Sequence, residues 1–355
     1  MLVPLNELLY PLSRALDFVE QELLGVMTNH GKRAAYVSAR ICKAMGLDDA
    51  QVCDMACCAI LHDNALTSYM LEAGPDGIGG FERFESHCAR GEENVRDFPF
   101  AGDTDGIILH HHENWDGSGF HKLAGSDIPL RALALRLADN MDLHLKMGDG
   151  RAGLALEIRR HAGDLRGTVY APRIVEALND ILTPDFLRDM ADDSIDAALN
   201  RIVPPVQTRM SNAQMLMVCN IFAMIIDAKS PFTRNHSTGV VRNITKLAEI
   251  FGMDEKRKER LMIAGYLHDL GKLATPLSIL EKPGPLSEDE FGVMRDHVAV
   301  TQELLAPVEG LEDIARWASQ HHEELRGNGY RAGLTATALP VESRGLAGCD
   351  SYQAL

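Results

Sequence analysis

The residues best suited to chemistry in this 355-residue chain are histidines and aspartates that recur at wide spacing in its C-terminal half. Imidazoles with a few carboxylates, and no thiolate among them, suit a first-row transition metal such as iron or manganese, with zinc possible. Seven ligands are too many for one tetrahedral site but fit two divalent ions that share a carboxylate and a water. The candidate metal ligands are His236, His268, Asp269, His297, His321, His322 and Asp350.

The same residue types recur in the same order in the N-terminal half. His236 lies 206 residues after His30, and Asp350 lies 211 residues after Asp139. Because the offset drifts so little over this length, the pattern indicates a duplicated module. A lone histidine on an apolar helix is more often a core residue than a ligand, but seven residue types in register are improbable as core packing. The possible second metal site comprises His30, His62, Asp63, His87, His111, His112 and Asp139.

Two further features of the second copy point to a bound ligand. Lys272 follows Asp269 by about one helical turn, so its ammonium can point to the side of that carboxylate and hold a phosphate oxygen. In the first copy Leu66 stands at the lysine position, so that copy either binds metal for structure or regulation or is a less efficient catalyst. The segment containing Gly329 and Tyr330 lets the backbone approach a ligand while the ring stacks or hydrogen-bonds. The alternative for Lys272 is a solvated surface lysine. The alternative for the segment with Gly329 and Tyr330 is an ordinary turn after a helix.

Helical signals dominate the elements that must position these residues. Ser230 and Pro231 predict a helix start ahead of a periodic apolar stretch that ends near Gly252. A second helix is predicted from about Asp254 to Leu267. Alternating β-branched runs are scarce, so the sequence predicts an all-α fold of two tandem helical domains, residues 1–205 and 206–355.

Composition limits the classes of partner. The formal net charge of −16 argues against general binding to nucleic-acid backbones or anionic lipid. The seven cysteines show no paired C-x-x-C spacing, which is typical of buried thiols in a reducing cytosol. No secretion signal is evident, and the most apolar run, 215–226, is too short to span a bilayer. A cytoplasmic protein without membrane contact is expected, with 215–226 as a core helix.

These motifs resemble those of the HD-GYP family, a bacterial branch of the HD phosphohydrolase superfamily. The resemblance covers most of the second copy, and a weaker version covers about 30–142. It implies hydrolysis of a cyclic dinucleotide, chiefly cyclic di-GMP and in some members cyclic GMP-AMP, to a linear dinucleotide or mononucleotides. The motifs that carry it are His268-Asp269-Leu270-Gly271-Lys272 and His321-His322-Glu323 with Gly327-Asn328-Gly329-Tyr330.

The resemblance also implies roles for individual residues. Asp269 bridges the metal ions, and Lys272 steadies the scissile phosphate. Family members with a third metal carry an acidic residue one turn before the first histidine, where this chain has Phe232 and Val26, so two ions are expected. Substrate contacts are expected from Lys272 and from Gly329, Tyr330 and Arg331, which stand at the positions of the family's Gly-Tyr-Pro, with arginine in place of proline.

The leading hypothesis is a cyclic-dinucleotide phosphodiesterase with the second copy as the working site. The first copy is then a regulatory or dimer-forming domain. The family continues past Asp350 where this chain stops at Leu355, so the second domain is expected to lack its last helices. Two alternatives stay open: a catalytically idle module that binds a nucleotide or a signalling-protein partner, and an HD-type hydrolase of a nucleoside polyphosphate or monophosphate.

Overall fold

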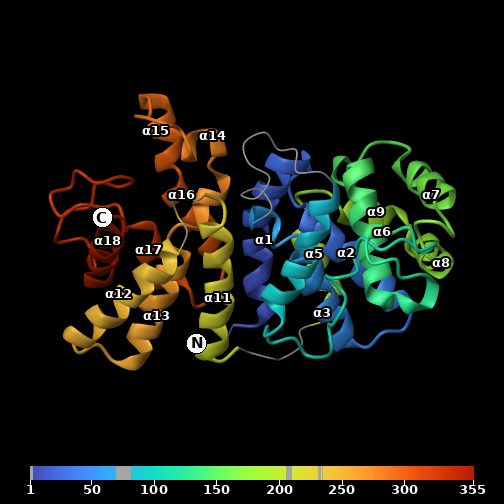
Figure 1. The fold of residues 1–355 in the computed structure, drawn as a ribbon, viewed down its shortest axis with the longest axis horizontal. Coiled ribbons are helices and arrows are strands. Elements are labelled where there is room, and N and C mark those ends of the chain that lie inside the picture. Colours follow the sequence, from blue (N-terminus) through green and yellow to red (C-terminus); the bar gives the residue numbers. More distant parts are fainter. Residues whose placement is uncertain (1–2, 69–80, 205–209, 231–232, 234) are drawn as a thin grey trace. The chain divides into compact units, whose positions relative to one another are not determined.

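The computed structural model describes residues 3–68, 81–204, 210–230, 233 and 235–355, with only the backbone for 81–84 (Figure 1). Apart from isolated β-bridges, the described residues form helices, turns and loops, and the predicted all-α fold is confirmed. The chain divides into two compact units. One contains the first copy, Pro4–Tyr69 with Ile78–Thr208, and the other contains the second copy, Arg209–Leu355.

Helix α2 is the centre of the first copy. It packs against α1, α3, α6, α8 and α10. Its inward face is fully buried, as expected for the central helix of a bundle. The α-helices of this unit are α1 (Leu5–Leu24), α2 (His30–Ala44), α3 (Asp49–Ile60), α5 (Phe81–Val95), α6 (Leu130–Leu145), α7 (Leu154–Asp164), α8 (Pro172–Ile181), α9 (Pro184–Asp189) and α10 (Ile195–Ile202), with 3-10 turns η1 (Gly125–Asp127) and η2 (Met147–Asp149).

The second copy repeats the core of this arrangement. Helix α12 corresponds to α2 and packs against α11, α13 and α18, just as α2 packs against α1, α3 and α6. The elements of this unit are α11 (Asn212–Asp227), α12 (His236–Ile250), α13 (Glu255–Leu267), η4 (Leu270–Ala274), α14 (Leu277–Leu280), α15 (Glu288–Arg295), α16 (His297–Leu305), α17 (Glu312–Ser319) and α18 (Val341–Gln353).

The predicted helix boundaries can be compared with the structure. Helix α13 follows Asp254, whose side chain accepts a hydrogen bond from the backbone of Arg257, so this start is confirmed. Helix α12 begins at His236, later than predicted, because Asn235 before it has a left-handed φ of 61°. Asn29 before α2 has the same conformation, with φ 63°, and asparagine tolerates it better than most residues. Pro231 and Phe232 lie outside the described residues.

The predicted core helix at 215–226 is confirmed as part of α11, where Val218 and Phe222 are fully buried. All seven cysteine side chains are buried, as predicted, and no disulfide joins them in the described part of the chain. Among the described residues, no helix is both long and apolar enough to cross a membrane.

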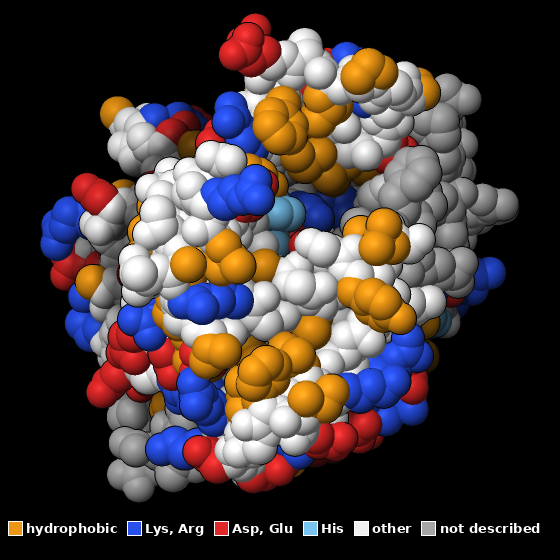
Figure 2. Space-filling view, turned by 90° about the vertical axis from the view of Figure 1, so that its left-hand side faces the viewer, with side chains coloured by type: hydrophobic (Ala, Val, Ile, Leu, Met, Phe, Trp, Pro, Cys, Tyr) orange, Lys and Arg blue, Asp and Glu red, His pale blue; other side chains and the backbone are white. Residues whose placement is uncertain are grey.

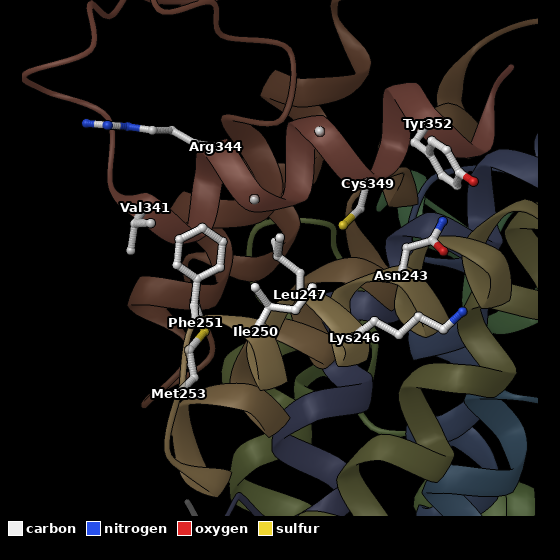
Figure 3. A pocket seen from close by; sticks show the side chains of 12 residues that line it. Asn243, Lys246, Leu247, Ile250, Phe251, Met253, Val341, Arg344, Cys349 and Tyr352 are labelled. Atoms are coloured by element: carbon white, nitrogen blue, oxygen red, sulfur yellow. The ribbon is translucent and has the colours of Figure 1, made fainter.

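A hollow of about 730 Å³ lies between α12 and α18 of the second copy (Figure 3). Apolar side chains such as Leu247, Phe251 and Val341 line it, together with Lys246 and Arg344. None of the predicted metal ligands lines it. In the first copy, helices α8 and α10 pack on α2, which is the helix that corresponds to α12.

Candidate metal centre

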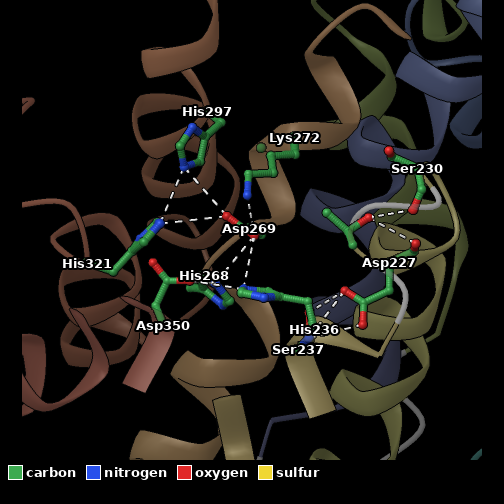
Figure 4. A network of polar contacts seen from close by, with 12 residues as sticks. Asp227, Ser230, His236, Ser237, His268, Asp269, Lys272, His297, His321 and Asp350 are labelled. Carbon is green, nitrogen blue, oxygen red and sulfur yellow. Dashed lines mark hydrogen bonds and ion pairs between the residues drawn. The ribbon is translucent and has the colours of Figure 1, made fainter. Parts of the chain in front are cut away.

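The carboxylate of Asp269 lies at the centre of the predicted ligands of the second copy (Figure 4). Its Oδ2 atom lies 3.4 Å from Nε2 of His268 and 3.9 Å from Nε2 of His236. Its Oδ1 atom lies 3.6 Å from Nε2 of His297 and 3.7 Å from Nε2 of His321. Each oxygen of this carboxylate therefore faces a different pair of imidazoles.

The two remaining predicted ligands extend these pairs. Asp350 joins the first pair, because its Oδ1 lies 3.0 Å from Nε2 of His236 and 3.7 Å from Nε2 of His268. His322 joins the second pair. Within each group the candidate ligand atoms lie within 4.8 Å of one another, the first group being His236, His268 and Asp350 and the second His297, His321 and His322.

Helix ends place most of these side chains. Asp350 lies within α18, and the ligands before it lie at the first residue of a helix or just after its last one. The two adjacent histidines lie in the turn after α17. His236 begins α12, His297 begins α16, His268 and Asp269 follow α13, and His321 and His322 follow α17.

Three of the imidazoles are oriented by a hydrogen bond to the backbone carbonyl three residues earlier. Because a carbonyl only accepts, Nδ1 carries the proton and the Nε2 lone pair faces the cluster. Proteins commonly fix histidine ligands in this way. The bonds run from Nδ1 of His268 to Gly265 (2.7 Å), of His297 to Met294 (2.7 Å) and of His321 to Ala318 (2.5 Å).

Several polar atoms at the centre of the cluster are buried without a hydrogen-bond partner among the described residues. They include Nε2 of His268 and Oδ1 of Asp269. Such atoms cost free energy in a protein interior unless something satisfies them. A divalent cation would satisfy them together, and a donor set rich in imidazole fits a transition metal better than calcium or magnesium. The residues present therefore fit the predicted metal ions.

Burial and neighbouring charges favour the metal-binding forms of Asp269, His321 and His322. Burial alone would raise the pKa of Asp269, but His268 and Lys272 outweigh it and hold this pKa well below its usual range. Burial lowers the pKa of His321 well below the usual value and that of His322 to about 4. The carboxylate is therefore ionised and these two imidazoles are neutral near pH 7.

Lys272 is held beside the central carboxylate. Its Nζ lies 2.6 Å from Oδ2 of Asp269, and 21% of its side chain is exposed. Burial alone would lower the pKa of Lys272, but Asp269 raises it, so the ammonium persists. The turn that carries it is anchored by the buried Lys229, whose Nζ donates to the carbonyls of Leu273 (2.5 Å) and Thr275 (2.8 Å). Figure 2 shows a histidine at the bottom of a surface hollow with a Lys or Arg side chain beside it.

The glycine-rich loop is fastened to the cluster by Glu323. Its carboxylate accepts hydrogen bonds from the backbone amides of Ala332 (2.7 Å) and Leu334 (2.8 Å). A Cβ atom at Gly329 would overlap the backbone of Glu323 and Glu324, so the close approach requires glycine. The loop is therefore packed closely against the turn that contains the two adjacent histidines.

The loop brings Tyr330 beside the ligands. Its ring stacks on His322, with centroids 4.7 Å apart and an interplanar angle of 28°. It also lies edge-on to His297, at 6.5 Å. The side chain of Arg331 is exposed, and its backbone amide donates to Glu323 at 3.3 Å. A planar ring and a lysine thus flank the predicted metal ligands.

The first copy repeats the central carboxylate. Oδ1 of Asp63 lies 3.2 Å from Nε2 of His87 and 3.6 Å from Nε2 of His111. Its Oδ2 lies 3.6 Å from Nε2 of His62. Leu66, fully buried, occupies the position of Lys272. The central aspartate is therefore present without its lysine.

The other three predicted residues of the first copy join the same cluster. Oδ1 of Asp139 lies 3.3 Å from Nε2 of His30 and 3.7 Å from Nε2 of His62. The rings of His111 and His112 have centroids 4.0 Å apart. All seven residues of the possible second metal site are thus brought together.

Sequence reasoning missed the carboxylates that fix the first histidine of each copy. Asp17 accepts hydrogen bonds from the backbone of Asn29 (2.8 Å) and Gly31 (3.1 Å). Asp227 accepts from the backbone and from Oγ of Ser237, the latter at 2.6 Å. Asp17 precedes Gly31 by 14 residues, whereas Asp227 precedes Ser237 by 10 residues. Because the spacing differs, a search for residues in register does not pair them.

Comparison with known proteins agrees with this geometry. An HD domain family profile matches residues 22–157 and 220–355, which together make up more than half of the chain. The chain belongs to the HD domain family. Each match contains one of the two clusters, so the prediction of two tandem HD-type domains is confirmed. The boundary at 205 and 206 stays a prediction.

Named relatives of this HD-domain chain are phosphodiesterases. It is 30% identical over 369 residues to 3'3'-cGAMP-specific phosphodiesterase 1 of Vibrio cholerae, covering 99% of this chain and 83% of the relative. It is 29% identical over 279 residues to 3'3'-cGAMP-specific phosphodiesterase 3 of that organism, covering 77% and 59%. It is 39% identical over 123 residues to the cyclic di-GMP phosphodiesterase response regulator RpfG of Xanthomonas campestris, covering 34% and 31%. The predicted resemblance to the HD-GYP family is confirmed.

A solved structure shares the fold. The crystal structure of a cyclic GMP-AMP specific phosphodiesterase of V. cholerae, V-cGAP3, superposes with a TM-score of 0.70 at 23% sequence identity. The match covers 100% of this HD-domain chain and 89% of that chain. The tandem helical architecture is therefore common to both.

Proposed function

We propose that the second copy is a metal-dependent phosphodiesterase that hydrolyses a cyclic dinucleotide, cyclic di-GMP or cyclic GMP-AMP. The observation that carries the proposal is the central position of Asp269, whose two oxygens face two separate groups of imidazoles while Lys272 lies beside it. The names of the relatives, which act on these two cyclic dinucleotides, support the substrate class.

The two groups would hold two divalent ions. His236, His268 and Asp350 would bind one, the three histidines of the other group would bind the second, and Asp269 would contribute one oxygen to each. When bound, such ions polarise phosphoryl oxygens and lower the pKa of a coordinated water near the phosphorus. Iron or manganese fits these ligands best, and zinc is possible.

The chain's own side chains would bind and orient the nucleotide. The Lys272 ammonium is charged and part-exposed, so it would bind a non-bridging phosphate oxygen and stabilise charge that develops there. The Tyr330 ring, fixed by its stacking on His322, would offer a flat surface to a base. The exposed Arg331 would contribute a second cation near the loop. Glu323 would keep this loop in place.

The test is hydrolysis of cyclic di-GMP and of 3'3'-cGAMP by the whole chain loaded with manganese or iron. We expect a linear dinucleotide or mononucleotides from the parent chain and no product from Asp269→Ala. Asp289→Ala, an exposed aspartate of the same copy, is the matched control and should retain the parent rate.

Three results would contradict the proposal. The first is binding of both nucleotides by the parent chain without turnover, which is the behaviour of an idle module. The second is hydrolysis of nucleoside polyphosphates or monophosphates alone. Finally, hydrolysis lost in Asp63→Ala but kept in Asp269→Ala would assign the reaction to the first copy.

A further inference from the structure

Glu20, in helix α1 of the first copy, is a buried carboxylate that lacks hydrogen bonds. Only 1% of the residue is exposed. Neither Oε1 nor Oε2 has a hydrogen-bond partner among the residues that the structure describes. A carboxylate in such a place is costly unless it is neutral or bound to a cation. Burial raises its pKa to about 8, so without a cation it would be protonated near pH 7.

The position of Glu20 points to the first-copy cluster. Helix α1 packs on α2, which begins with His30, and on α3, which leads to His62 and Asp63. The charges that act on Glu20 from these elements are those of His30, His62 and Asp63. Asp17, one turn earlier on the same helix, also acts on it, but the Asp17 carboxylate is already satisfied by two backbone amides.

The cluster itself contains other unsatisfied atoms. Nε2 of His62, Oδ1 of Asp63 and Nε2 of His111 are buried and lack a hydrogen-bond partner within the described residues. Imidazole nitrogens and carboxylate oxygens that are unsatisfied together form a donor set for a cation. Glu20, on the helix that packs against the helices carrying His30 and leading to His62, would add a carboxylate to that set.

The two copies differ in charge and in access. The first copy has the fully buried Leu66 where the second copy has the charged Lys272, and Glu20 would add a negative charge when a bound cation ionises it. The side chain of His30 is 2% exposed and that of His236 is 14% exposed. More negative charge strengthens cation binding and repels a phosphodiester. A more closed ligand shell is typical of structural rather than catalytic metal sites.

We propose that Glu20 is a metal ligand in the first copy, and that this copy holds a divalent transition-metal ion in a closed structural site without hydrolysing phosphodiesters. The proposal goes beyond the reaction assigned to the second copy. It gives the degenerate copy a chemical role of its own, because metal binding there would stabilise the fold of the first unit.

The test uses the whole chain with His268→Ala, Asp269→Ala and His321→Ala, which removes candidate ligands from both groups of the second copy. Manganese is the probe, and the readouts are its affinity, measured by equilibrium dialysis and elemental analysis, and the rise in unfolding temperature that it causes. We expect Glu20→Gln, a substitution of similar shape, to lower the affinity on the order of tenfold or more. Glu22→Gln, an exposed position on the same helix, should leave it unchanged.

The outcomes are distinct from those of the phosphodiesterase assay, because the second site no longer contributes. Affinity within about twofold of the parent in Glu20→Gln would overturn the proposal and leave Glu20 as a neutral buried acid. The proposal would also be overturned if the chain that carries only the second-copy substitutions bound no manganese. If Glu20→Gln does not fold, Glu20→Asp keeps the charge on a shorter side chain, and its affinity should still fall below that of the parent; an unchanged affinity there would refute the assignment.

Discussion

Replacement of Lys272 by methionine separates substrate stabilisation from metal binding. The ammonium lies 2.6 Å from Oδ2 of Asp269, on the part-exposed side of the cluster. Methionine keeps most of the length and apolar volume of the side chain but removes the charge. We expect Lys272→Met to retain its metal, because loss of a neighbouring cation leaves Asp269 no less able to bind one.

The expected loss of rate follows from the electrostatics of the site. At an effective dielectric constant of about 20, a unit charge about 4 Å from the ammonium is stabilised by about 4 kcal/mol. Only the part of this energy that grows as charge develops in the transition state accelerates the reaction. Loss of one such contact commonly costs about 2.7–4 kcal/mol, so kcat should fall about 10²–10³-fold.

The assay is steady-state hydrolysis of a cyclic dinucleotide, together with elemental analysis of the same preparations. Lys256→Met, at an exposed position on α13, is the matched control and should leave kcat and metal content unchanged. A kcat within tenfold of the parent would refute a role in stabilising the transition state. Loss of metal in parallel with activity would show instead that Lys272 acts by supporting the metal ligands.

Three other predictions test the surroundings of the site. Tyr330→Ala should raise KM about tenfold or more by removing the stacking surface, whereas Tyr330→Phe should stay within about threefold of the parent; equal effects would point to the hydroxyl instead. Glu323→Gln should lower the free energy of unfolding by about 1–3 kcal/mol in chemical denaturation, because an amide cannot accept all the backbone bonds of the carboxylate; unchanged stability would contradict that role. Removal of metal by a chelator should lower the unfolding temperature, and manganese or iron should restore it while magnesium and calcium should not; restoration by magnesium would argue for an oxygen-dominated site.

Much of the candidate site could be predicted because ligand chemistry depends on residue type and order. The repeated histidines and aspartates indicated two clusters, and the structure brings all fourteen predicted residues together as two sets. The position of Lys272 beside Asp269 also followed from local spacing, since one helical turn relates them. Helix α13 and the core helix α11 were predictable from capping and apolar periodicity.

The sequence by itself therefore determined the residue types, their duplication and the helical class. Only the tertiary structure decided which oxygen of Asp269 faces which imidazoles, because that depends on how α12, α13, α16 and α18 pack. It also decided that Glu20 is buried without a hydrogen-bond partner among the described residues and that Glu323 fastens the loop. Both residues resemble ordinary surface acids in the sequence, since burial and unsatisfied hydrogen-bonding capacity arise only when helices distant in the chain come together.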